Sequence, residues 1–179
     1  MSVRAIIGLA GLGVLAACWL GPLPGWAERS FSAHMLMHVT VIALAAPLLA
    51  IGVAAAGFDI GARVRWLGSP VLASLIELIV VWAWHTPRLH HLARTHDLLL
   101  WLEQASYLLV GLLIWLSAFG GPKHDSSRVA AGVAGLLLTS MHMTLLGVLL
   151  ATADRPLFAH SAAPWFGLTL LQDQQIGGV

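Results

Sequence analysis

The sequence contains little charge. Only 9% of its 179 residues are Asp, Glu, Lys or Arg, whereas a soluble domain has about 25%. Since 59% of the residues are hydrophobic and the mean hydropathy is +0.86, most of the surface must face lipid rather than water. The net charge is only +1, so the chain lacks the basic field that attracts nucleic acid, and that class of partner is excluded.

Cysteine is nearly absent as well. Cys18 is the single cysteine, which excludes an internal disulfide and any paired-thiolate metal site. A metal site in this chain would therefore use histidine, methionine or carboxylate ligands. The sequence also lacks internal repeats and low-complexity linkers. We interpret residues 1–179 as one integral-membrane helical domain.

The sequence contains several long apolar runs. A spanning helix needs about 20 mostly apolar residues, and the stretches that reach or approach this length are residues 4–21, 34–56, 70–86, 98–119 and 129–153. A further stretch begins near Trp165 and is too short to span before Val179. The predicted fold is an all-α, polytopic transmembrane helix bundle with about five full spans and a partial C-terminal sixth.

The first apolar stretch has a second interpretation. Arg4, the apolar core and "LAAC" ending at Cys18 resemble a lipoprotein signal peptide. The following "WLGPL" stays apolar, so we expect a retained helix.

The distribution of histidine indicates an orientation. With the N-terminus in the cytoplasm, the basic residues expected inside are Arg4, Arg63, Arg65, Lys123 and Arg128, against Arg29, Arg88, Arg94 and Arg155 outside. This bias is weak. The same topology places most histidines near the outer face: His34, His38, His85, His90, His91, His96 and His160. We expect a multi-pass protein of the bacterial inner membrane whose histidine-rich face points to the periplasm.

The segment "FSAHMLMHVTVI" carries the first candidate metal site. His34 and His38 are four residues apart, which places them about 40° apart on one helix face. Met37 lies on the flank of that face and is an accessory candidate. The alternative is that both histidines are half-hydrated at the membrane interface and the methionines fill gaps.

Other ionisable residues lie inside the apolar runs. His142 in "MHMTLLG" lies about 15 Å deep at 1.5 Å per residue, where an ionisable group needs a partner. It is either a metal ligand or a histidine hydrogen-bonded to a neighbouring helix, with Glu77 as the expected partner. Glu77 and Glu103 are accessory candidates, as metal ligands, proton acceptors or partners that orient an imidazole.

Two further segments carry polar candidates. "WHTPRLHHLARTH" contains several histidines, of which His85 is the best ligand candidate because Pro87 stiffens its surroundings; His96 is an accessory candidate. "LLQDQQIGG" places Asp173, Gln174 and Gln175 in an apolar segment. We expect them to cap a helix or to pack against other helices, and Asp173 and Gln174 are accessory candidates for closing the metal site.

Several motifs follow one another from about residue 20 onward: "PLPGWAERSFSAHMLMHVTVIALAAPLLAIG", "VVWAWHTPRLHHLA", "LEQASYLLVGLLIW", "MHMTLLGVLLATADRPLFA" and "DQQIGG". The series resembles the CtaG-like multi-spanning membrane proteins implicated in cytochrome c oxidase assembly. The resemblance implies a helix bundle, an assembly role for a haem–copper oxidase and a part in supplying copper. The matching positions are His34 and His38 in "HMxxH", His85 in the "WH.P" element, the late helical His142, and Asp173 to Gln175 in "DQQ".

The chain departs from this pattern in two respects. Gln104 and Leu100 stand where many relatives have histidine, which implies a thinner or altered site. The family usually has an additional helix before and after the matched region, so we expect either a short member or a truncated sequence.

The leading hypothesis is a non-enzymatic cytochrome c oxidase assembly factor that binds copper at its outer face and helps deliver it to oxidase subunits. His34 and His38 would hold the ion, with His85 or His142 completing the site. A copper transporter or resistance-type permease, a haem-binding membrane protein with axial histidines such as His38 and His142, and a purely structural chaperone stay open. Homo-oligomerisation also stays open.

Overall fold

The computed structural model describes residues 2–64, 66–119, 126–158 and 167–179. The predicted start of the sixth segment near Trp165, the histidine at His160, and the basic residues Arg65 and Lys123 lie outside the described residues. The described chain forms an all-α bundle, which confirms the predicted fold class.

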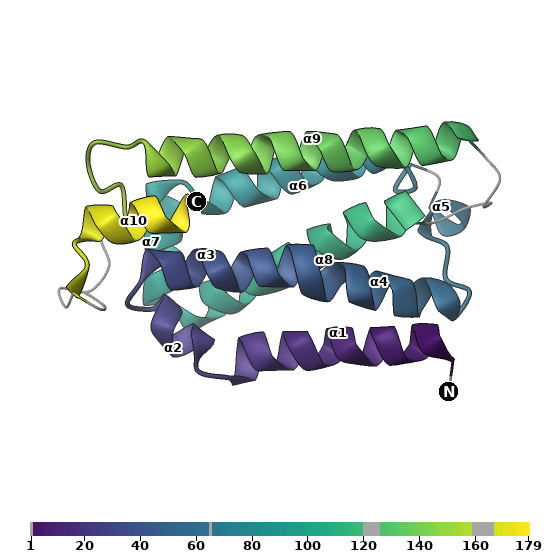
Figure 1. The fold of residues 1–179 in the computed structure, drawn as a ribbon, viewed down its shortest axis with the longest axis horizontal. Coiled ribbons are helices and arrows are strands. Elements are labelled where there is room, and N and C mark those ends of the chain that lie inside the picture. Colours follow the sequence, from purple (N-terminus) through teal and green to yellow (C-terminus); the bar gives the residue numbers. More distant parts are fainter. Residues whose placement is uncertain (1, 65, 120–125, 159–166) are drawn as a thin grey trace.

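Long helices run side by side along the bundle and reverse direction from one to the next (Figure 1). They are α1 (Val3–Leu20), the helix formed by α3 (Phe31–Thr40), η1 (Val41–Ala45) and α4 (Ala46–Ala55), then α6 (Pro70–Trp84), α8 (Asp97–Phe119) and α9 (Ser126–Ala151). Short helices lie at the ends. The end that holds α2 (Leu23–Ala27), α7 (Pro87–Thr95) and α10 (Leu170–Gly177) is opposite the end that holds α5 (Ile60–Arg63) and the chain's N-terminus.

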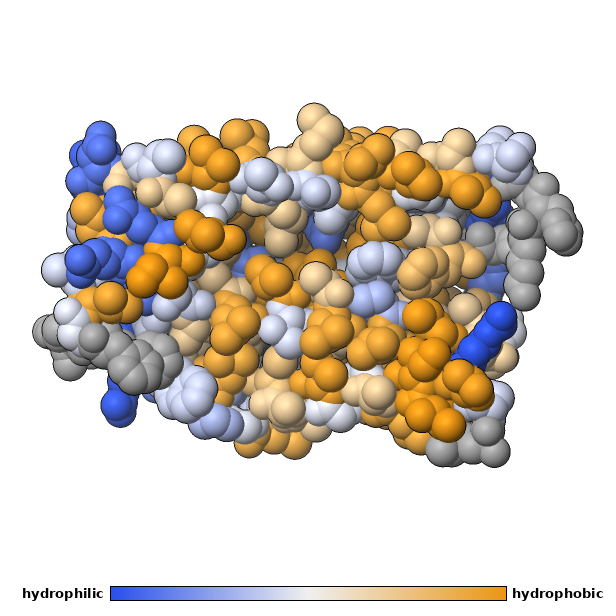
Figure 2. All heavy atoms as spheres, in the orientation of Figure 1, coloured by the Kyte–Doolittle hydropathy of each residue, from blue (hydrophilic) through white to orange (hydrophobic). Residues whose placement is uncertain are grey.

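The lengths of these helices agree with membrane spans. Within the described residues, four are long and apolar enough to cross: Val3–Leu20, Phe31–Ala55, Asp97–Phe119 and Ser126–Ala151. The third predicted span is shorter than expected, because α6 ends at Trp84 and the chain bends by 71° into α7; the bent pair makes a fifth candidate. On the face shown in Figure 2, apolar side chains cover the middle and hydrophilic ones gather toward the ends, as a bilayer requires.

Helices in lipid associate through close packing and hydrogen bonds, because lipid tails are as apolar as the protein's own core. α1 and α4 meet at Gly8 and Gly52, where a Cβ on Gly52 would lie only 2.7 Å from the Cα of Gly8. α6 packs against α8 and α9, and α8 also packs against α4. These pairings fix how the ends of α3, α6 and α8 meet.

The helix that carries the histidine pair contains a π-helical turn. Pro47 has no N–H for the carbonyl one turn earlier, and its ring crowds that carbonyl, so the α-helical pattern is disturbed just before it, at Val41–Ala45. Trp115 of α8 donates its indole N–H to the carbonyl oxygen of Ile42, 2.9 Å away. This bond anchors the widened turn to α8 and thereby fixes the rotation of α3 in the bundle.

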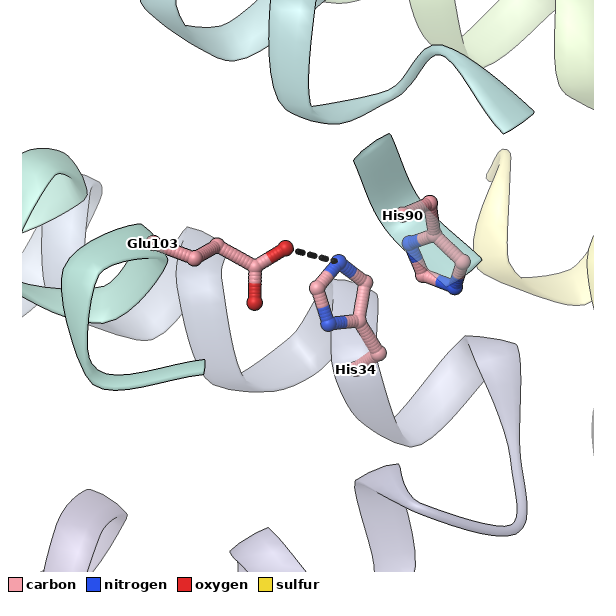
Figure 3. Close-up of side chains that lie close together, drawn as sticks. All are labelled: His34, His90 and Glu103. Atoms are coloured by element: carbon pink, nitrogen blue, oxygen red, sulfur yellow. Dashed lines mark ion pairs between the residues drawn. The ribbon is translucent and has the colours of Figure 1, made fainter. Parts of the chain in front are cut away.

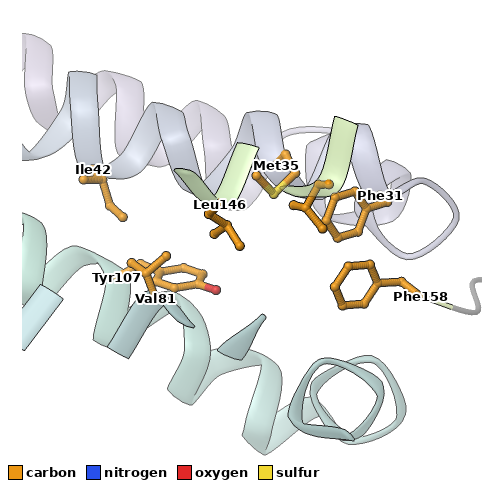
Figure 4. Close-up of a cluster of buried hydrophobic side chains, with 8 residues drawn as sticks. Phe31, Met35, Ile42, Val81, Tyr107, Leu146 and Phe158 are labelled. Atoms are coloured by element: carbon orange, nitrogen blue, oxygen red, sulfur yellow. The ribbon is translucent and has the colours of Figure 1, made fainter. Parts of the chain in front are cut away.

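A cluster of buried apolar side chains extends from the π-turn toward the end of the bundle that holds α2, α7 and α10 (Figure 4). It draws on α3, η1, α6, α8 and α9 and on the segment after α9, with these members: Phe31, Met35, Ile42, Val81, Tyr107, Leu146, Leu150 and Phe158. Phe31 and Phe158 stack with centroids 4.5 Å apart. Phe31 and Tyr107 of this cluster lie against the rings of His34 and His38, which are fully buried.

Candidate metal centre

Three other histidine rings gather around that of His34, and the four come from three helical segments. The ring centroid of His34 lies 4.8 Å from that of His90, 5.8 Å from that of His38 and 5.8 Å from that of His85. His34 and His38 come from α3, His85 follows α6, and His90 belongs to α7. All four are buried. The bend between α6 and α7 is what brings His90 back over the end of α3.

Glu103 approaches this group from α8 (Figure 3). Its Oε1 lies 3.9 Å from His34 Nε2, too far for a hydrogen bond. One ligand atom each from His34, His90 and Glu103 fall within 4.8 Å of one another. Transition metals bind imidazole nitrogen and carboxylate oxygen at about 2.0–2.2 Å, so a single ion could bridge His34 and Glu103.

The ring nitrogens of His34 and His38 are buried without a protein partner. Neither Nδ1 nor Nε2 of either residue makes a hydrogen bond, and both side chains are fully buried. A buried polar group left unsatisfied costs about 1–3 kcal/mol. Four such nitrogens in one place are available to hydrogen-bond to water or to ligate an ion.

Glu103 is held in orientation by its other oxygen. Arg94 of α7 pairs with Oε2, and the amide of Gln104 donates to the same oxygen at 3.4 Å. Oε1 has no hydrogen-bond partner and is the oxygen that faces His34. Carboxylates that ligate metals are oriented in this way by neighbouring donors.

His85 is fixed by the end of its own helix. Its Nδ1 lies 2.7 Å from the carbonyl oxygen of Val81, which accepts the proton of that nitrogen. Its Nε2 then points toward the thioether of Met35, with 3.2 Å between nitrogen and sulfur. The ring of His85 also lies 5.1 Å from that of His38, which in turn lies 4.9 Å from the ring of Tyr107.

The "DQQ" segment lies in the middle of α10, and its aspartate holds the start of α3. The carboxylate of Asp173 accepts hydrogen bonds from the backbone N–H of Phe31 at 2.6 Å and of Ser32 at 3.2 Å, and from the hydroxyl of Ser30 at 2.7 Å. The two N–H groups are donors that a helix N-terminus leaves without a partner inside the helix, and a negative charge at that end is favourable. Asp173 thus positions the helix that carries His34 and His38.

The neighbouring glutamines fasten α10 to the end of α9. The side chain of Gln174 accepts from the backbone N–H of Leu157 at 2.6 Å and donates to the carbonyl of Leu150 at 3.4 Å. Gln175 donates to the carbonyl of Ala153 at 3.2 Å. The predicted accessory residues of this segment therefore pack against other helices, as one of the two sequence interpretations expected.

His142 belongs to a different polar group, between α6 and α9. Its Nε2 lies 3.7 Å from Glu77 Oε2, an oxygen that also accepts a hydrogen bond from Thr139 at 2.5 Å. The Thr139 hydroxyl lies 2.9 Å from that of Ser74. Glu77 is thus the neighbour of His142, as the alternative interpretation expected, but the 3.7 Å separation is longer than the hydrogen bond that it predicted.

Two other accessory candidates also lie apart from the four rings. Met37 is buried on the side of α3 where Trp19, Leu100, Trp101 and Gln104 line a small pocket. His96 is exposed at the end of α7. Leu100 thus faces Met37, and Gln104 reaches Glu103.

The sequence patterns gave little indication that His90, Met35 and Arg94 belong to the site. The segment of His90 and Arg94, which lies between the predicted spans 70–86 and 98–119, forms α7, with Pro87 as its first residue. His90, Ala93 and Arg94 have the spacing of one helix face. This periodicity is the feature of the sequence that indicates a helix here, with His90 and Arg94 on the same side. The contact between Met35 and His85 has no signal in the sequence, because it joins residues 50 positions apart.

Fold and site together define a multi-pass helical membrane protein with a buried histidine–carboxylate cluster at one end of its bundle. The model of the family "Cytochrome c oxidase caa3 assembly factor (Caa3_CtaG)" matches residues 2–179, so the chain belongs to this family of oxidase assembly factors. No curated protein matches the chain. No solved structure matches it either.

Proposed function

We propose that this assembly factor binds copper in the histidine cluster and helps deliver it to cytochrome c oxidase. The supporting observation is the set of unsatisfied ring nitrogens on His34 and His38, buried within reach of His85, His90 and Glu103. A metal ion would take one nitrogen of each ring, and imidazole suits copper.

The donor set fits copper in both common oxidation states. Imidazole and carboxylate suit Cu(II), whereas the thioether of Met35 beside His85 suits Cu(I). In this role the protein passes copper to another protein and catalyses no reaction. Oxidase subunits are the recipients, and the family membership supports this association.

The proposed orientation rests on the predicted cytoplasmic N-terminus. The cluster lies at the end of the bundle opposite the N-terminus of α1. With the N-terminus in the cytoplasm of a bacterium, the cluster faces the periplasmic side of the inner membrane. Metal can then be taken up and passed on outside the cell.

Metal analysis and optical spectra of the detergent-purified protein test this proposal. We expect about one copper per chain and no Soret band. The His34→Ala/His38→Ala double variant should lose the metal. The matched control is His91→Ala/His96→Ala, because both residues are exposed, and it should retain the metal. Protein that binds no copper in either oxidation state, or a double variant that binds as the wild type does, would contradict the proposal.

A copper permease is the second candidate. The group formed by Ser74, Glu77, Thr139 and His142 gives a transport path a second polar position inside the membrane. Copper uptake into proteoliposomes distinguishes the two functions. A donor leaves the vesicle lumen free of copper, whereas a permease fills it, and Glu77→Gln would then slow the filling.

A further inference from the structure

The contact between His85 and Met35 has an unusual chemistry. In the neutral imidazole, one ring nitrogen carries the proton and the other carries a lone pair. The Nδ1–H of His85 donates a hydrogen bond to the carbonyl oxygen of Val81, 2.7 Å away. Its Nε2 therefore presents a lone pair to the Met35 sulfur at 3.2 Å, and the sulfur is itself only a weak acceptor.

Two electron-pair donors that face each other gain nothing from the contact unless a cation joins them. Nitrogen and thioether sulfur together form a soft donor pair, which selects Cu(I) over harder ions. Methionine is unbranched and flexible, so its sulfur can move outward to admit an ion. The carbonyl of Val81 meanwhile holds the His85 ring in one tautomer, as partners of metal-bound histidines commonly do.

The two sides of the cluster thus differ in donor type. On one side, His34 and His90 face the carboxylate of Glu103, which is a nitrogen and oxygen set. On the other side, His85 faces Met35, and His38 is the adjacent ring, with nitrogens that lack a protein partner. The ring centroid of His34 lies 4.8 Å from that of His90 in the first set and 5.8 Å from that of His85 in the second.

Met35 also lies where the cluster reaches the surface of the bundle. It lines a groove of about 460 Å³ beside α2 and the end of α10, and a second of about 610 Å³ between α3 and α9. His34 and His38 are fully buried, while Met35 is 7% exposed. An incoming ligand can therefore approach the soft side of the cluster through Met35.

We propose that Met35 and His85, with His38 adjacent, form a Cu(I)-selective position at the edge of the histidine cluster. This inference rests on the proposed copper function and adds a specific oxidation state and a specific sulfur ligand. The ligands of this position differ from those of the site formed by His34, His90 and Glu103, and a single copper ion occupies one position or the other according to its oxidation state. Occupation of one does not require any redox step at the other.

Competition with a Cu(I)-specific chelator tests the inference on the full chain in detergent under reducing conditions. Met35→Leu should weaken Cu(I) binding by about tenfold or more, because the thioether is lost while the side-chain volume is nearly kept. Zn²⁺, which has little preference for thioethers, should bind this variant as it binds the wild type. X-ray absorption of the Cu(I)-loaded wild type should show a sulfur neighbour that Met35→Leu lacks.

Met37→Leu is the matched comparison, because it makes the same change two residues away on the side of α3 that faces Trp19 and Gln104. Cu(I) affinity and the sulfur signal should stay at the wild-type level in this variant. Equal Cu(I) affinity in wild type and Met35→Leu, or a Cu(I) spectrum without sulfur, would overturn the inference. Wild type that binds Cu(II) but not Cu(I) would overturn it and leave the proposed function standing, whereas wild type that binds neither would overturn both.

Discussion

Arg94 of α7 and Glu103 of α8 form an ion pair beside His34 that is almost completely shielded from solvent. The pair ties the short helix that carries His90 to the long helix that carries the carboxylate. It also leaves Oε1 of Glu103 directed at His34. One interaction thus joins two of the segments from which the candidate metal centre is built.

Arg94→Ala should destabilise the protein and weaken metal binding together. The substitution leaves Glu103 buried without its cation, and breaking a buried pair from one side costs about 3–5 kcal/mol. Thermal unfolding in detergent, with and without Cu(II), measures both effects. Arg88→Ala, an exposed change on the same helix, is the control and should behave as wild type. An unchanged melting temperature for Arg94→Ala would contradict a charged, paired Glu103.

Asp173→Ala should loosen the start of α3. The carboxylate accepts hydrogen bonds from two backbone N–H groups at the helix N-terminus, and loss of such a cap costs about 1–2 kcal/mol. Hydrogen exchange should become faster at the amides of residues 31–33, and copper affinity should fall because His34 lies on this first turn. Asp154→Ala, an exposed acid near the same end of the bundle, should change neither quantity. Unchanged exchange at residues 31–33 would show that the cap does not hold the helix.

His142→Ala should lower stability without removing the metal. Its imidazole lies against Glu77 between α6 and α9, and the substitution leaves that carboxylate with one partner fewer. We expect a loss of about 1–3 kcal/mol and a copper content per folded chain equal to that of wild type. Inductively coupled plasma analysis of the monodisperse fraction decides the second point. Loss of copper would place His142 among the ligands, as the sequence hypothesis had it.

The bundle could be predicted from the sequence because lipid imposes one strong requirement on it. Backbone polar groups in the bilayer must be paired within the segment, so long apolar runs between polar breaks become helices. The predicted stretches 98–119 and 129–153 correspond closely to Asp97–Phe119 and Ser126–Ala151. The exception is 70–86, where Pro87 starts a new helix and the bend shortens the span.

The candidate metal centre was only partly predictable. The pairing of His34 with His38 follows from helix periodicity, and Glu103 was named as a candidate from its depth in the membrane. The positions of His90 and Arg94 depend on the 71° bend after α6, which returns α7 to the cluster. Periodicity within one helix carries no information about such a bend.

The choice between Met35 and Met37 shows the same limit. Both follow His34 within one turn, and the sequence favoured Met37 because of its place on the flank of the histidine face. In the bundle Met35 meets His85, while Met37 turns toward Trp19 and Gln104. The rotation of α3 about its axis decides this, and that rotation is set by the π-turn before Pro47 and by the Trp115–Ile42 hydrogen bond.

By itself, the sequence determined the helical class, the spans and the gathering of histidines toward one end, since these depend on apolar length and on residues near each other in the chain. Only the tertiary structure decided which histidines meet, which carboxylate oxygen faces them and which methionine is in reach. Those contacts join residues from four different helices. They are fixed by helix rotation and packing, which depend on the whole bundle at once.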